Sequence, residues 1–187
     1  SRGLVGSEMC IRDRRECGVY SEILPWDVEE SVLTSQDIQG IILSGGPETV
    51  TFDASPKAPK IVFELGLPIL GICYGMQTIA SQLGGQVESA SKSEFGYASI
   101  KLKTDSVLTD GIVIDHLDVW MSHGDKVTAL PEGFETLAAS DSAPIAAMVN
   151  KQKNFYGLQF HPEVTHSEHG MQTVSYTHLR AHETSGY

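Results

Sequence analysis

The chain has 187 residues, an ordinary share of apolar residues and a formal net charge of −11. This length suits one domain with a real core, and an acidic chain without a lysine- or arginine-rich run is not expected to bind nucleic acid. No window approaches the roughly 18 unbroken apolar residues of a membrane span, and no secretory signal is visible, so no membrane partner is expected. Cys10, Cys17 and Cys73 have neither a disulfide-ladder nor a zinc spacing, which favours a reducing, cytoplasmic setting.

The two ends of the chain do not share the pattern of the rest. Residues 1–14 and 174–187 show no usable periodicity and no clear helix cap, and both resemble translated sequencing-adapter read-through. The alternative is an ordinary flexible terminus at each end. We therefore expect a non-native N-terminal segment over 1–14, one domain over 15–173 and a non-native C-terminal segment over 174–187.

The first half of the domain alternates predicted strands and helices. In chain order, we expect a strand at 18–24, a short helix or loop at 27–36, a strand within 37–47, a helix at 55–66, a buried strand at 67–70 and a helix after Cys73. Proline near the start and glycine at the end mark the 55–66 segment as helical. This β-α-β-α order predicts an α/β domain with a parallel sheet.

The second half is richer in strand patterns. Short apolar or alternating runs follow one another at 97–103, 118–125, 135–140, 145–150 and 155–163. Their close spacing predicts antiparallel additions to the sheet, with the last strand returning to its parallel part.

The turn Gly71-Ile72-Cys73-Tyr74-Gly75 is a G-x-C-x-G version of the strand-to-helix elbow that exposes a nucleophile. Its glycines relieve the crowding of a tight bend. A cysteine at a helix N-terminus is also favoured as thiolate, because the free N–H groups and the helix dipole stabilise negative charge. The alternative is a buried cysteine that fills a small gap in the core.

The turns after Leu43, Ile72 and Phe160 are predicted to open at one edge of the sheet, where the carboxyl ends of the strands meet. Cys73 would there lie near His161, which could serve as its base, with Glu163 orienting the imidazole. The N–H groups of Gly46 and Tyr74 could stabilise an oxyanion. Taken singly, each could be an ordinary loop or surface residue. His166 and His169 lack further ligands, so no metal is expected.

These motifs resemble the class I glutamine amidotransferase family, and within it the domains of GMP synthetases. The resemblance covers about Glu16 to Gln172. The family shares the elbow, the "SGGP" turn at 44–47 and the "HPE" segment at 161–163. More specific are the segments "GICYGMQ" at 71–77, "EFGYA" at 94–98, "WMSHGDKV" at 120–127 and "QFHPEVTH" at 159–166.

The resemblance implies that Cys73 attacks the side-chain amide of glutamine to form a thioester and release ammonia. His161 would be general base and then acid, Glu163 would orient it, and Gly46 and Tyr74 would supply the oxyanion N–H groups. The residues implied to line or support the glutamine pocket are Gln77, Ser122, His123, Asp125 and Tyr97. Helix-surface and loop polar roles are the alternative for this last group.

The implied fold is α/β and flavodoxin-like, a central mostly parallel sheet flanked by helices with an added antiparallel β portion. The family's first central strand and last helix have no counterpart in the sequence, so we expect this polypeptide alone to be unstable or poorly active. No cofactor is expected in this domain. ATP and Mg²⁺ would belong to a synthetase module, in the same chain or a separate subunit, that takes the ammonia and converts XMP to GMP. Homo-oligomer formation would involve regions absent from this sequence.

Two other functions remain open from the sequence. A class I amidotransferase could serve another acceptor, of the anthranilate or aminodeoxychorismate type, although "WMSHGDKV" argues against it, and a related cysteine hydrolase could act on other amides. A non-catalytic relative could use the fold as a binding module. Such a relative should lack part of the triad, whereas Cys73, His161 and Glu163 are all present.

Overall fold

The structure, a computed structural model, describes residues 20–46, 49–51, 55–106, 108–109 and 116–162, without the side chains of 90–94. The segments 1–14 and 174–187 lie outside the described residues. The elements in chain order are α2 (Glu30–Ser35), β1 (Ile41–Leu43), the 3₁₀ helix η1 (Lys60–Phe63), β2 (Ile69–Ile72), α3 (Tyr74–Gln82), β3 (Gln86–Leu102), β4 (His116–Ala129), β5 (Glu135–Ala139), β6 (Ala147–Asn150) and β7 (Phe155–Leu158).

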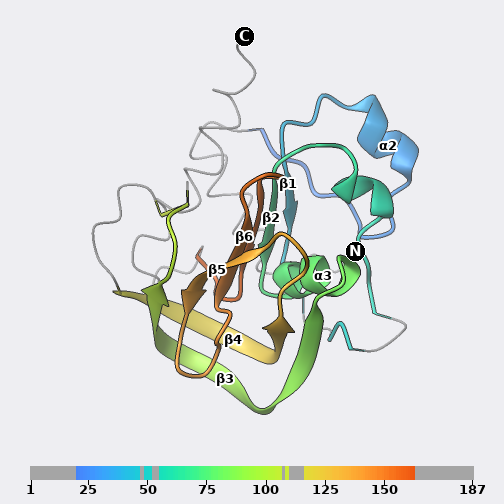
Figure 1. Cartoon of the computed structure of the whole chain (residues 1–187). Helices are drawn as coiled ribbons and strands as arrows, with labels where there is room; N and C mark the ends of the chain where they lie inside the picture. Colours follow the sequence, from blue (N-terminus) through green and yellow to red (C-terminus); the bar gives the residue numbers. More distant parts are fainter. Residues whose placement is uncertain (1–19, 47–48, 52–54, 107, 110–115, 163–187) are drawn as a thin grey trace.

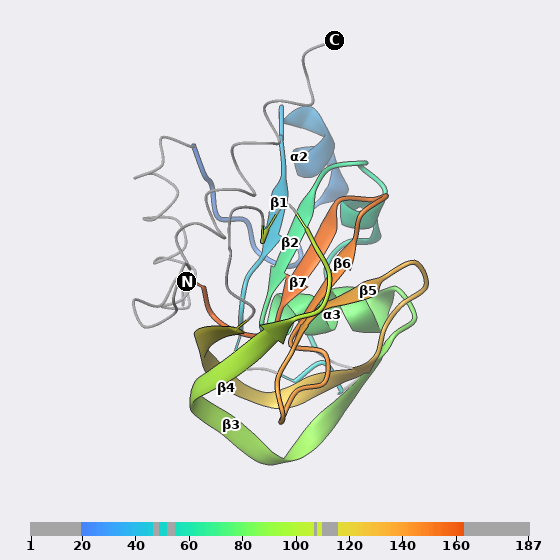
Figure 2. The ribbon, with the colours of Figure 1, turned by 60° about the vertical axis from the view of Figure 1, so that its left-hand side comes forward.

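The strands form one seven-stranded mixed sheet in the order β1-β2-β7-β6-β5-β3-β4. β1, β2 and β7 run parallel (Figure 2), and the remaining neighbours pair antiparallel. In the register, Leu43 lies opposite Gly71, and Ile72 lies opposite Leu158. The carboxyl ends of the three parallel strands therefore meet at one edge of the sheet, which is where sequence patterns placed the reactive groups.

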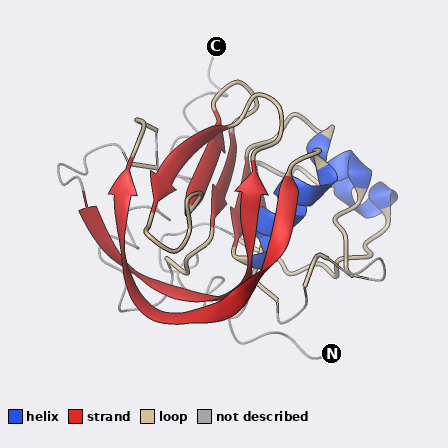
Figure 3. Ribbon diagram, turned by 60° about the horizontal axis from the view of Figure 1, so that its bottom comes forward, coloured by secondary structure: helices blue, strands red, loops and turns tan. Residues whose placement is uncertain are grey.

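Two hydrophobic clusters cover the two faces of the parallel strands. Successive side chains of a strand point to opposite faces, so Ile69 of β2 packs with α3 and η1, while Leu70 and Ile72 face the inner side of β3 and β4. The described helices lie on one side of the sheet, and β3 and β4 curl as a long ribbon beneath the rest of it (Figures 1 and 3).

Burial in this core raises the pKa of the Tyr156 hydroxyl above its ordinary 10.0.

The α/β class, the added antiparallel portion and the return of the last strand to the parallel part are confirmed. The strand expected at 18–24 is wrong for residues 20–24, which are irregular. A strand needs a neighbour for its hydrogen bonds, and no described strand pairs with this segment. The helix expected at 55–66 shrinks to the single turn η1, because Pro56 and Pro59 break regular helix geometry ahead of it.

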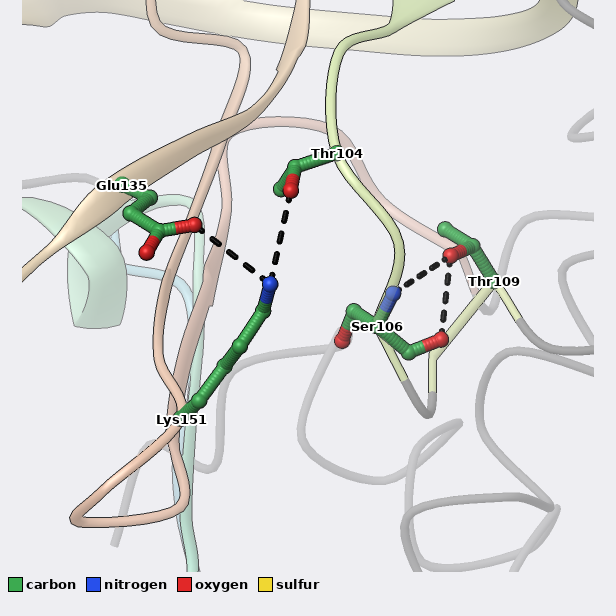
Figure 4. Close-up of polar contacts among 5 residues, drawn as sticks. All are labelled: Thr104, Ser106, Thr109, Glu135 and Lys151. Atoms are coloured by element: carbon green, nitrogen blue, oxygen red, sulfur yellow. Dashed lines mark hydrogen bonds and ion pairs between the residues drawn. The ribbon is translucent and has the colours of Figure 1, made fainter.

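Polar contacts lie at the end of the sheet where β7 begins, opposite to the carboxyl ends of the parallel strands, and Figure 4 shows them in close-up. Lys151, in the turn between β6 and β7, lies 3.4 Å from a carboxylate oxygen of Glu135 and donates to the Thr104 hydroxyl. Both charged side chains are exposed, so the pair adds little stability. Thr109 accepts a hydrogen bond from the N–H of Ser106 and donates to its carbonyl, which closes the turn after β3.

The elbow between β2 and α3 depends on two close backbone approaches. A Cβ on Gly71 would lie 2.6 Å from the carbonyl carbon of Gly75, and a Cβ on Gly75 would lie 1.9 Å from the carbonyl oxygen of Leu43. No side chain fits at either distance. Glycine at both positions therefore lets α3 begin directly against β1 and β2, which confirms the role predicted for the two elbow glycines.

We predict that Gly75→Ala destabilises the protein by about 1–3 kcal/mol or more, because the methyl group would displace β1 from α3. Alanine's better helix propensity, about 1 kcal/mol, is too small to offset this clash. The measurement is the free energy of unfolding in urea.

Gly40→Ala is the matched control. Its Cβ would lie 3.5 Å from the Pro68 carbonyl oxygen, an ordinary contact, so its stability should stay within about 1 kcal/mol of the unchanged protein. Equal stability of the two variants would contradict the packing argument.

Candidate active site

Cys73 is the residue that joins β2 to α3, and its backbone is strained. Its φ of 53° and ψ of −108° are values that a residue with a side chain rarely adopts. Its N–H donates to the Leu158 carbonyl at 2.7 Å, so β7 holds the bend in place. Cys73 is a free cysteine, 6% exposed. The geometry matches a nucleophile elbow, in which strain and neighbouring strands fix the direction of the reactive side chain.

The three predicted turns do converge. A Cβ placed on Gly45 would lie 3.1 Å from Cε1 of His161 and 3.6 Å from Cβ of Cys73. The N–H of His161 donates to the Trp120 carbonyl at 3.2 Å, which anchors the segment after β7 to β4. The glycine turn, the thiol and the imidazole therefore meet at the carboxyl edge of the parallel strands, as the sequence predicted.

Two polar groups touch the sulfur of Cys73. Sγ lies 3.5 Å from the Ser122 carbonyl oxygen, to which a thiol can donate. On another side, Nε2 of Gln159 lies 3.8 Å from Sγ and can donate to it. The sulfur thus has an acceptor and a donor within reach, so both the neutral and the ionised form find a partner.

A buried polar network continues from this point to β4. Gln77, 3% exposed, donates from Nε2 to the Asp125 carbonyl at 2.9 Å and to Oε1 of Gln159 at 3.3 Å. Nδ1 of His123 lies 3.0 Å from the same Asp125 carbonyl. Gln77, His123 and Asp125 are therefore brought together behind Cys73. Their contacts fit support of the pocket, one of the two roles the resemblance implied.

The carboxylate of Asp125 connects three segments. It accepts hydrogen bonds from the hydroxyl of Thr49, in the chain after the glycine turn, and from the hydroxyl of Ser89 in β3, at 2.8 Å. The side chain is buried. Asp125 therefore ties the chain that follows the glycine turn at 44–46 to the β3–β4 ribbon.

The other residues predicted for the site make different contacts. Tyr97 is 65% exposed and packs edge-on against Trp120, with ring centroids 5.4 Å apart. The Tyr74 hydroxyl donates to the Pro56 carbonyl at 2.6 Å, so that side chain anchors a loop while its N–H starts α3. Gly46 is half-buried beside Gly45. Glu163 lies outside the described residues.

Three residues of the site were not predicted from the sequence, namely Thr49, Ser89 and Gln159. For Gln159 a signal exists, since it is a polar residue directly after the apolar strand Phe155–Leu158 and two positions before His161. Thr49 and Ser89 carry no such signal, because their role depends on the approach of segments far apart in sequence.

The part of the chain that the structure describes contains no group of three or more His, Cys, Asp or Glu side chains that could hold a metal ion. No helix in the same part is long and apolar enough to cross a membrane.

The glutamine amidotransferase class-I family model matches residues 6–180, and the chain belongs to this family. It is 54% identical over 175 residues to the GMP synthase [glutamine-hydrolyzing] of Pectobacterium carotovorum, covering 90% of this chain and 33% of that protein. A relative of the same name from Alteromonas mediterranea is 54% identical over 176 residues, covering 90% of this chain and 34% of the relative. The chain thus spans about a third of the length of these curated relatives.

Solved structures agree with this assignment. A putative GMP synthase subunit from Thermoplasma acidophilum superposes with a TM-score of 0.82 at 28% identity, covering 98% of this chain and 92% of that one. A glutamine amidotransferase from Thermotoga maritima shares the fold, with a TM-score of 0.68 at 23% identity, covering 87% of this chain and 74% of that one.

We predict that Gly45→Ala slows alkylation of Cys73 by iodoacetamide about threefold to tenfold near neutral pH. The added methyl group must push the imidazole of His161 by a few tenths of an ångström, which should weaken the action as a base that the sequence predicts for His161. Mass spectrometry of the peptides separates Cys73 from Cys10 and Cys17.

Gly40→Ala again serves as the control, since its methyl group meets only the Pro68 carbonyl. An unchanged rate for Gly45→Ala, in a protein with an unchanged unfolding midpoint, would show that His161 does not act on Cys73.

Proposed function

We propose that this chain is the glutaminase part of a GMP synthetase, which hydrolyses glutamine to glutamate and ammonia. One observation carries the proposal: Cys73 lies on a strained elbow, and the glycine turn at Gly45 brings the imidazole of His161 close to it. This arrangement suits acyl transfer through a thiolate nucleophile. The identity to relatives named glutamine-hydrolysing GMP synthases supports the choice of glutamine.

In the proposed reaction, His161 takes the proton of the Cys73 thiol, and the sulfur attacks the side-chain amide carbon of glutamine. The tetrahedral oxyanion is stabilised by the N–H groups of Gly46 and Tyr74. The C–N bond then breaks, the leaving nitrogen takes a proton from His161, and ammonia departs, leaving a thioester on Cys73. Water attacks the thioester with His161 as base, which releases glutamate and restores the thiol. Glu163 is proposed to orient His161 throughout.

Glutamine would occupy the space between the turn at 44–46 and β4, bounded by Ser122. Gln77, His123 and Asp125 support this wall through the buried network, and Tyr97 would stand at its outer rim beside Trp120. Since the contacts of Gln77, His123 and Asp125 are already formed in the structure, this wall of the proposed glutamine pocket would need little ordering on binding, which lowers the entropic cost.

We further propose that the ammonia passes to a synthetase module, in the same chain or as a separate subunit, which converts XMP to GMP with ATP and Mg²⁺. The glutaminase reaction itself uses no cofactor in this scheme, because the thiol, the imidazole and backbone N–H groups supply all its steps. Homo-oligomer formation and a cytoplasmic location stay predictions from the sequence.

The test is glutamate release from glutamine by this chain, alone and with a GMP synthetase's synthetase module, ATP and XMP supplied. Cys73→Ala should lower the rate at least about a thousandfold, because no other group replaces the nucleophile. Cys17→Ala is the matched control and should retain the rate.

The acceptor is tested in the same assay by replacing XMP with chorismate and a chorismate-aminating enzyme. Amination of chorismate but not XMP would favour the anthranilate-type alternative. No glutamate release under any of these conditions, by a protein that unfolds cooperatively, would favour the non-catalytic binding module.

A further inference from the structure

We propose that Gln159 is a thiolate-stabilising residue, which donates a hydrogen bond from its side-chain amide to the ionised sulfur of Cys73. The inference deepens the proposed function, since it concerns the same nucleophile. Gln159 is 0% exposed, directly follows β7, and places Nε2 3.8 Å from Sγ. A fully buried amide needs hydrogen-bond partners at both ends, and the sulfur is the partner that its nitrogen has.

The orientation of the amide follows from its neighbours. Both N–H groups of Gln77 are directed at acceptors, the Asp125 carbonyl and Oε1 of Gln159. Because Gln77 presents donors, Gln159 must present its oxygen in return. Its nitrogen then faces the opposite way, toward Sγ of Cys73. The backbone of β4 thereby determines, through two side-chain amides, which atom faces the nucleophile.

The two contacts of the sulfur favour different protonation states. The Ser122 carbonyl can only accept, so it stabilises the neutral thiol as donor. The amide of Gln159 donates, and hydrogen bonds to an ionised acceptor are roughly twice as strong as those between neutral groups. Because the residue Cys73 is only 6% exposed, water cannot supply this stabilisation in full. Gln159 therefore shifts the balance toward the reactive form.

Gln159→Glu is the sharpest test, because it keeps the shape and the acceptor for Gln77 but puts a carboxylate in place of the N–H donor. Gln159→Met removes donor and acceptor at similar volume. The measurement is the rate of Cys73 alkylation by iodoacetamide against pH, resolved by peptide mass spectrometry. Both variants should reach half-maximal rate at higher pH, and the rate near neutral pH should fall about threefold to tenfold for Gln159→Met and further for Gln159→Glu.

Asn150→Asp is the matched control, an amide-to-acid change in a similarly buried residue of β6. Its alkylation profile should stay unchanged. An unchanged profile in a folded Gln159→Glu protein would overturn the proposal. If both Gln159 variants fail to fold, Gln77→Glu is the test, because it removes the donors that orient Gln159. It should raise the pH of half-maximal alkylation of Cys73 in the same way. An unchanged profile of Gln77→Glu would also overturn the proposal.

Alkylation requires no glutamine, so this test is independent of the proposed substrate. A shifted alkylation profile in the Gln159 variants, with no glutamate release by the unchanged chain, would contradict the proposed glutaminase activity but support the role of Gln159. Glutamate release by the unchanged chain, together with an unshifted alkylation profile in the Gln159 variants, would support the glutaminase and overturn the role of Gln159.

Discussion

The structure depends on the close approach of three backbone segments at the elbow. Gly75 lies against the carbonyl of Leu43, and Gly71 lies against Gly75 itself, at distances that exclude any side chain. This contact sets α3 directly behind the ends of β1 and β2. It also forces Cys73 into its strained conformation, because the chain must reverse within one residue. The position of the nucleophile is thus a consequence of backbone packing.

The rest of the fold maintains that packing. β2 and β7 are buried along their whole length, with the helices on one face and the curled β3–β4 ribbon on the other. The ribbon both closes the core and supplies the carbonyls of Trp120 and Ser122 to His161 and Cys73. Because the same ribbon carries Asp125, which Thr49 contacts, a change in the curl of the ribbon would alter both the surroundings of the sulfur and the chain after the glycine turn at 44–46.

The features predicted from the sequence are those determined by local pattern. The apolar run before Cys73, the periodicity after it and the paired glycines are contiguous, so the elbow and the order of elements follow from them. The convergence of Gly45, Cys73 and His161 follows from one general rule about parallel strands. What escaped prediction depends on distant contacts. The network of Thr49, Ser89 and Asp125 could not be predicted, because it depends on how far the β3–β4 ribbon curls. The strand expected at 18–24 is irregular over residues 20–24, since alternation alone cannot provide a neighbouring strand.

The proposed function requires above all that Cys73 is a nucleophile directed at glutamine. The most direct test is covalent labelling with a diazoketone analogue of glutamine, read by peptide mass spectrometry. We predict one adduct, on Cys73, whose formation is suppressed by excess glutamine and greatly slowed by His161→Ala. Equal labelling of Cys17 and Cys73, or labelling of Cys73 that glutamine does not suppress, would contradict it.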